Sequence, residues 1–130
     1  MIKYHKNIVT IACVLAILAI ILGAFAAHGL KPLISPNSLA VFQTGVTYQM
    51  YHALALLAVA LIPGLETKKA EGVSRLFVFG TLFFSGSLYF LALKSVLPFS
   101  VSFLSPLTPV GGLLLIAGWA FLAYRVIKMK

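Results

Sequence analysis

Hydrophobic positions form four long stretches that short polar or turn-forming segments separate. The stretches cover residues 8–27, 42–62, 73–93 and 108–124. Each is close to the ~20 residues that an α-helix needs to cross a bilayer. The pattern therefore predicts an all-α integral membrane protein, with four spanning helices in a single domain over residues 1–130.

Turn and capping signals lie at the ends of these stretches. Residues 28–32 (HGLKP) place Gly and Pro after the first stretch. Ser35-Pro36 is typical of an N-cap followed by Pro at the first helical position. The second helix is therefore expected to begin near residue 36, before the hydrocarbon, and to end at Pro63-Gly64. Thr108-Pro109 is expected to open the fourth.

The ten Lys and Arg residues are unevenly distributed along the chain. With four crossings, both termini and the middle loop share one side, and only Lys31 and Lys94 lie on the other. By the positive-inside rule this distribution predicts an up-down-up-down four-helix bundle with both termini in the cytoplasm. The residues assigned to the cytoplasmic side are Lys3, Lys6, Lys68, Lys69, Arg75, Arg125, Lys128 and Lys130.

Composition supports a membrane location and argues against nucleic-acid binding. Hydrophobic residues make up 62% of the chain, and its mean hydropathy is +1.08. The net charge of +8 lies at segment ends and forms no basic helix face, so no nucleic-acid partner is expected. The start also resembles a secretory signal, but its apolar run is about 20 residues, against roughly 7–15 for a signal core. We therefore interpret it as a membrane helix.

Polar side chains gather in the half of the helices that faces away from the cytoplasm. In hydrocarbon such groups need partners, so they are expected to face the bundle interior or a water-filled vestibule. They form the candidate binding site, with no catalytic residue and no metal ligand among them. Its residues are His28, Lys31, Gln43, Tyr48, Gln49, His52, Ser85, Ser87, Tyr89, Lys94 and Thr108.

One polar stripe on the second helix is the predicted wall of this site. Gly45, Tyr48, Gln49 and His52 recur at helical spacing on one face. The alternative is a hydrogen-bond network that only joins the helices, and the pattern does not separate the two. On the third helix, the serines of Ser85-Gly86-Ser87 are expected to bond to their own backbone rather than to reach His52.

The outer ends of two helices add a hypothesis about charge. The N-termini at Ser35-Pro36 and at residues 108–112 direct positive dipole ends outward. Lys31 and Lys94 lie on the same side, and no Asp or Glu opposes them. The outer mouth is therefore expected to attract an anionic group, such as a lipid headgroup or a small acid.

Catalytic and cofactor chemistry is not expected. The only side-chain carboxylates are Glu66 and Glu71 in the middle loop, so a hydrolytic triad lacks its acidic member. His28 and His52 differ in depth by about 15 Å at ~1.5 Å per residue, too far for paired haem ligation. We therefore expect neither an enzyme nor a bound cofactor.

Small residues at helical spacing raise the question of self-association. Ala19, Gly23 and Ala27, and likewise Gly111 and Gly118, allow helices to approach closely. They indicate either a homo-oligomer interface or packing within the bundle, and packing is the simpler interpretation. Membrane lipids are the remaining expected partners.

Four ordered motifs resemble those of a bacterial inner-membrane family called domain of unknown function 423. They are Gly23–Leu30 (GAFAAHGL), Gln43–Ala55 (QTGVTYQMYHALA), Phe84–Tyr89 (FSGSLY), and Thr108–Gly112 (TPVGG) with Ala117-Gly118-Trp119. The chain departs from the family pattern at Ala26, where the family usually has Gly. The resemblance implies four membrane helices in the bacterial cytoplasmic membrane and carries no established activity.

Three functional hypotheses follow. The first is a protein that binds a lipid headgroup or small anionic solute in an outward-facing polar pocket. The second is a structural or accessory subunit whose polar cluster joins its own helices. The third is an oligomeric channel or transporter, which requires assembly because a 14.0 kDa chain leaves little room for a pore. A hydrated pocket favours the first hypothesis, and a dry, fully paired cluster favours the second.

Overall fold

Four long α-helices make up the protein in the computed structural model, which describes residues 4–129. No strand occurs in this range, so the all-α prediction is confirmed for it. Lys3 and Lys130, which the charge argument uses, lie outside the described residues. The helices are α1 (Lys6–Phe25), α2 (Pro36–Ala60), α3 (Thr67–Ala92) and α4 (Leu107–Ile127), with a π-helical turn η1 (Ala26–Leu30) after α1 and a 3-10 turn η2 (Ser102–Leu104) before α4.

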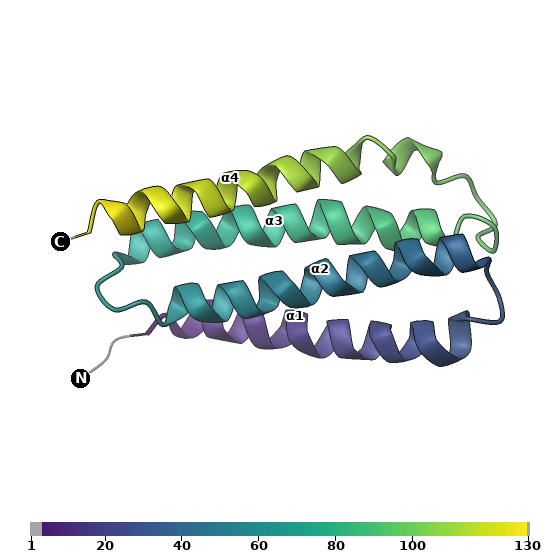
Figure 1. Cartoon of the computed structure of the whole chain (residues 1–130), viewed down its shortest axis with the longest axis horizontal. Helices are drawn as coiled ribbons and strands as arrows, with labels where there is room; N and C mark the ends of the chain where they lie inside the picture. Colours follow the sequence, from purple (N-terminus) through teal and green to yellow (C-terminus); the bar gives the residue numbers. More distant parts are fainter. Residues whose placement is uncertain (1–3, 130) are drawn as a thin grey trace.

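The helices form an open row. Extensive contacts join α1 to α2, α2 to α3, and α3 to α4, and over residues 4–129 no comparable interface joins α1 to α4. Figure 1 shows the four helices side by side in chain order, with the start of α1 and the end of α4 at the same end of the molecule. A closed bundle pairs its first and last helices as well. The row therefore leaves one flank of α1 and one of α4 without a neighbour.

Three helical segments of the described chain are long and apolar enough to cross a membrane. They are Lys6–Leu30, Thr67–Ala92 and Ser102–Ile127. Although α2 is 25 residues long, it falls outside this group because polar residues are frequent in its middle, between Gln43 and His52. A membrane crossing by α2 thus stays a prediction.

Helix ends follow the sequence signals in part. Ser35 caps α2, since its side-chain oxygen accepts a hydrogen bond from the Ser38 backbone N–H at 3.2 Å. Gly64 has a φ of 79°, a left-handed conformation that Gly adopts without strain, in the turn after α2. The first helix does not stop at His28, because the π-helical turn η1 carries it to Leu30.

The fourth helix begins at Leu107, so Thr108-Pro109 lies inside its first turn instead of opening it. Pro106 occupies the N-cap position, and no side-chain cap bond forms there. The third helix begins earlier than expected, at Thr67 rather than residue 73. Charged residues of the middle loop are thereby drawn into the first turns of α3.

Two hydrophobic clusters lie at different levels of the row. The larger includes Leu56 and Val59 of α2 with Val73 and Phe77 of α3. The smaller lies toward the other end and contains Ala26, Leu30, Phe42 and Ala92. Ala26 is fully buried there, so the methyl group that replaces the family's usual Gly is packed against its neighbours. Most buried polar residues of α2 and α3 lie at the level between the clusters, namely Gln49, His52, Thr81, Ser85 and Ser87, whereas Ser74 lies beside Val73 of the larger cluster.

Candidate functional site

Gln49 joins three helices at this level. Its side chain is 5% exposed. The Nε2 atom donates to the backbone carbonyl of Leu15 in α1 at 2.8 Å, and Oε1 accepts from the Tyr89 hydroxyl of α3 at 2.7 Å. Both ends of the amide are therefore paired with protein groups.

Ser85 fixes α3 against α2 at a close approach of the two helices. Its hydroxyl donates to the backbone carbonyl of Gly45 at 2.7 Å. A Cβ atom at Gly45 would lie 2.6 Å from Cε1 of the Tyr89 ring, so only Gly fits at this crossing without displacing that ring. The expectation that Ser85 bonds to its own helix was wrong, because the carbonyl of Gly45 comes within reach of its hydroxyl.

His52 links α2 to α4, and its partners define its tautomer. Nδ1 lies 2.8 Å from the backbone carbonyl of Tyr48, and the indole N–H of Trp119 donates to Nε2 at 3.0 Å. A carbonyl only accepts and an indole N–H only donates. The imidazole is therefore neutral in this arrangement, with its proton on Nδ1.

Ser87 and Thr108 join α3 to α4. Their hydroxyl oxygens lie 2.6 Å apart. The Ser87 hydroxyl also lies 3.0 Å from the carbonyl of Phe84, one turn earlier in its own helix. The expected local bond of Ser87 thus forms together with an interhelical one. We call Gln49, His52, Ser85, Ser87 and their side-chain partners Tyr89, Thr108 and Trp119 the polar layer.

The predicted stripe on α2 does not form one wall. Gln49 lines a groove between α1 and α3 with a volume of about 260 Å³. Tyr48 and His52 line a second groove, of about 300 Å³, between α2 and α4. The wall is split because α3 packs against α2 between these side chains, and the remaining lining of both grooves is mainly apolar.

The other predicted site residues lie apart from the polar layer. His28, Lys31 and Gln43 are exposed, and no side-chain hydrogen bond joins them to another described residue. Lys94 is also exposed, but it lines a groove of about 480 Å³ near the N-termini of α2 and α4. We call this the outer groove. Its lining residues are Asn37, Ser38, Val41, Leu88, Leu91, Ala92, Lys94, Ser105 and Thr108.

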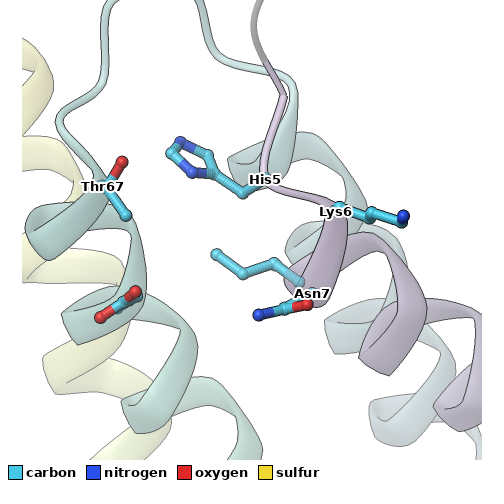
Figure 2. A pocket seen from close by; sticks show the side chains of 6 residues that line it. His5, Lys6, Asn7 and Thr67 are labelled. Atoms are coloured by element: carbon cyan, nitrogen blue, oxygen red, sulfur yellow. The ribbon is translucent and has the colours of Figure 1, made fainter.

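A further cavity, of about 210 Å³, lies at the opposite end of the row, where α1 and α3 begin. Figure 2 shows the His5 ring directed across the gap toward Thr67, and the Lys6 side chain directed away from it. Glu71 also lines this cavity, and its carboxylate lies 3.8 Å from the Arg75 guanidinium. The lining contains one lysine and one carboxylate and so has no net formal charge.

Metal ligands do not converge in the described part of the chain. Over residues 4–129 no group of three or more His, Cys, Asp or Glu side chains is placed to hold a metal ion. Cys13 is exposed on α1.

Two members of this region were missing from the sequence-based site. Trp119 was not among the predicted site residues, yet its N–H is the partner of His52. The available signal was the need of a buried or membrane-embedded indole N–H for an acceptor. Thr81 is 3% exposed, and its hydroxyl has no partner among the described residues; it lines the α1/α3 groove beside Gln49.

The small residues pack mainly within the chain. A Cβ atom at Gly111 would overlap the backbone of Phe84, and one at Gly118 would lie 2.7 Å from the Phe77 ring. Ala19 is buried, whereas Ala27 is exposed. The simpler interpretation, packing inside the protein, thus accounts for the small residues of α4.

Sequence comparisons place the chain among uncharacterised membrane proteins. The family described as "Protein of unknown function (DUF423)" matches residues 22–112. A UPF0382 membrane protein of Staphylococcus epidermidis is 40% identical over 123 residues, which cover 95% of this chain and 97% of the relative. The Bacillus subtilis UPF0382 membrane protein YwdK is 36% identical over 129 residues, covering 95% and 98%.

The similarity extends beyond bacteria. A UPF0382 membrane protein of Schizosaccharomyces pombe is 38% identical over 111 residues, which cover 85% of this chain and 92% of the relative. No solved structure matches the chain. The relatives' names thus support a membrane location and leave the kind of membrane open.

Proposed function

The chain belongs to the DUF423 family, and from this premise we propose that it is a non-enzymatic structural or accessory subunit of a membrane assembly. The observation that carries the proposal is the pairing within the polar layer. Gln49, His52, Ser85 and Ser87 direct their hydrogen bonds to other residues of the same chain. A site that binds a polar solute needs free donors or acceptors, and these four residues offer few.

In the proposed orientation both termini and the α2–α3 turn lie in the cytoplasm and all four helices cross the bacterial cytoplasmic membrane in alternating directions. The basic residues near the start of α1, the start of α3 and the end of α4 support this orientation through the positive-inside rule. For α2, pairing of Gln49 and His52 inside the protein removes much of the cost of placing them in hydrocarbon.

The open row offers a place for a partner helix. In a closed bundle the flanks of α1 and α4 cover each other, whereas here each is free. The α2/α4 groove includes Leu115, Ile116 and Trp119 and is almost entirely apolar in its lining. Membrane helices associate through close packing of such surfaces. We propose that a second copy of this chain packs its own α4 against the groove, which makes a two-fold symmetric contact.

Cysteine cross-linking in native membranes tests this arrangement. In a Cys13→Ala background, Ile116→Cys places a thiol at a groove residue that is 66% exposed. Leu113→Cys is the matched control, since Leu113 is 67% exposed on the same helix but outside the groove lining. Mild oxidation is expected to give a dimer with Ile116→Cys and much less with Leu113→Cys. A monomer with both variants, and a monomer in native mass spectrometry, would exclude self-association.

A second candidate function is binding of an anionic group at the outer groove. The observation that favours it is the groove's composition, in which Lys94 lies near Asn37, Ser38 and Thr108 and no acidic residue is present. We propose a phospholipid headgroup as the occupant. Native mass spectrometry should find a retained anionic lipid that Lys94→Gln loses. Lys31→Gln removes an equal charge from outside the groove and should retain it. Equal retention by both variants would remove this candidate.

A further inference from the structure

A small concavity with a basic lining lies where the α2–α3 turn meets the end of α4. Its volume is about 120 Å³. We call it the basic pocket; it is far along the row from the outer groove, and it shares no residue with the polar layer. Its lining residues are Gly64, Leu65, Glu66, Lys69, Arg125, Lys128 and Met129.

Positive charge predominates in this lining. Lys69, Arg125 and Lys128 face a single carboxylate, that of Glu66. Among the described residues the one ion pair within 4.0 Å is Arg75–Glu71, so Glu66 neutralises none of the three at that distance. An anion that entered the pocket would therefore meet cations that are not already paired.

Arg125 lines the pocket, and its side chain has a hydrogen-bond donor without a partner among the described residues. Its Nε atom is buried and has no hydrogen-bond partner in the part of the chain that the structure describes. A buried donor without a partner is rare in proteins and calls for an explanation, such as an ion or water that completes it. The planar guanidinium suits a bidentate pair with carboxylate or phosphate oxygens.

Tyr124, beside the pocket lining, contacts two of the cations. The Arg125 guanidinium carbon lies 5.6 Å from the centroid of the Tyr124 ring, and the Lys128 Nζ lies 5.7 Å from it. Both distances are in the range of cation–π attraction. The ring therefore attracts both positive groups at the end of α4.

We propose that the basic pocket binds a phosphate group, carried by an anionic phospholipid headgroup or by a free phosphate anion. A volume of about 120 Å³ holds several water molecules and is therefore large enough for one tetrahedral phosphate group. Arg125 supplies a fork of donors, and Lys69 and Lys128 supply point charges. Basic pockets at the cytoplasmic ends of membrane helices recognise lipid headgroups in this way. This proposal goes beyond the accessory role and does not depend on self-association.

Adjacent lysines on α3 provide a matched test. Lys69 lines the pocket and is partly buried, whereas Lys68 is exposed and outside the lining. Lys69→Gln and Lys68→Gln therefore remove equal charge from neighbouring positions. The full chain, in an uncharged maltoside detergent, is titrated with dioleoylphosphatidylglycerol or dioleoylphosphatidylcholine and followed by native mass spectrometry. Inorganic phosphate is titrated separately by calorimetry.

One phosphatidylglycerol or one phosphate is expected to bind to each chain, more tightly than phosphatidylcholine. Lys69→Gln and Arg125→Gln should weaken binding at least tenfold, and Lys68→Gln less than twofold. Binding of the lipid alone identifies a headgroup site, and binding of inorganic phosphate as well identifies a site for the phosphate itself. Lys128 is exposed, so Lys128→Gln changes no buried group and should fold normally. It should also weaken binding, and it therefore tests the pocket even if the Arg125 variant misfolds. Equal losses with Lys68→Gln and Lys69→Gln, or no one-to-one binding of either probe, would overturn the proposal.

Discussion

Replacement of Gly111 by Ala tests how closely α3 and α4 approach each other. A Cβ atom there would overlap the backbone nitrogen of Phe84 and lie 2.8 Å from the carbonyl oxygen of Gly80. These are backbone atoms, so no side-chain rotation relieves the overlap. At the next position, Gly112, the nearest atom to an added Cβ is Cδ1 of Phe84 at 3.8 Å, an ordinary contact.

The size of the effect follows from two opposing contributions. Carbon contacts are optimal at roughly 3.5 Å or more, so Gly111→Ala must move α4 away from α3 by about 1 Å. Overpacking of this kind costs about 1–3 kcal/mol. Ala has a higher helix propensity than Gly, and this difference stabilises the folded state by up to ~1 kcal/mol. We expect Gly111→Ala to lower the free energy of unfolding by about 1–2 kcal/mol, and Gly112→Ala to leave it unchanged or raise it by up to ~1 kcal/mol.

Reversible unfolding in bicelles measures both variants against the original chain. Gly86→Ala is a second control, because no heavy atom beyond its own helix lies within 4 Å of an added Cβ. The three substitutions share the same chemistry in a helical setting and differ in the space available. If Gly111→Ala proved as stable as Gly112→Ala, the close approach of α3 and α4 would be wrong.

Three further substitutions address single contacts. Trp119→Phe keeps an aromatic ring but removes the donor to His52. In bicelles the free energy of unfolding should fall by about 0.6 kcal/mol and at most ~1.7 kcal/mol. An unchanged free energy of unfolding would argue against that bond. Ser85→Ala should cost about 1 kcal/mol, because the Gly45 carbonyl loses its added donor, and a stability equal to that of the original chain would contradict the contact. Gly64→Ala should cost about 1–2 kcal/mol in the same assay, because its φ of 79° disfavours a side chain, and a neutral result would mean that the turn has another conformation.

Local signals in the sequence were sufficient to find the four helices, but not to place all of their ends. Ser35-Pro36 identified the start of α2, because a cap and a fixed proline φ act on neighbouring atoms of the chain. The start of α3 was placed too late because its first turns carry Lys68, Lys69 and Glu71, which hydropathy assigns to a loop. Charged residues are compatible with helix outside hydrocarbon, so hydropathy marks the span and not the helix.

Apart from Trp119, the residues of the polar layer were anticipated from the sequence, but their connections were not. Gly45, Gln49 and His52 were correctly placed on neighbouring turns of α2, yet their partners depend on how far α1, α3 and α4 slide along α2. Periodicity within one helix carries no information on that register. The link from Gln49 to the Leu15 carbonyl illustrates the limit, because every residue has a carbonyl and none can be singled out from sequence.

The sequence also did not predict whether the four helices form a closed bundle or an open row. Short connections favour antiparallel neighbours in both arrangements. The two arrangements differ in whether α1 packs against α4. Both helices are apolar around most of their surface, and the chain is expected to lie in lipid. An apolar flank is compatible with lipid or protein, so hydropathy does not distinguish the two.

Contact between sequence neighbours alone has a consequence for how the protein is made. Because α1 packs on α2 and, among the described residues, shares no large interface with α4, the contacts between α1 and α2 can form before the second half of the chain has been synthesised. Such a low contact order favours rapid, stepwise assembly during translation. Gln49 then acts in two stages, since its bond to α1 can form with the first hairpin and its bond to Tyr89 forms when α3 arrives.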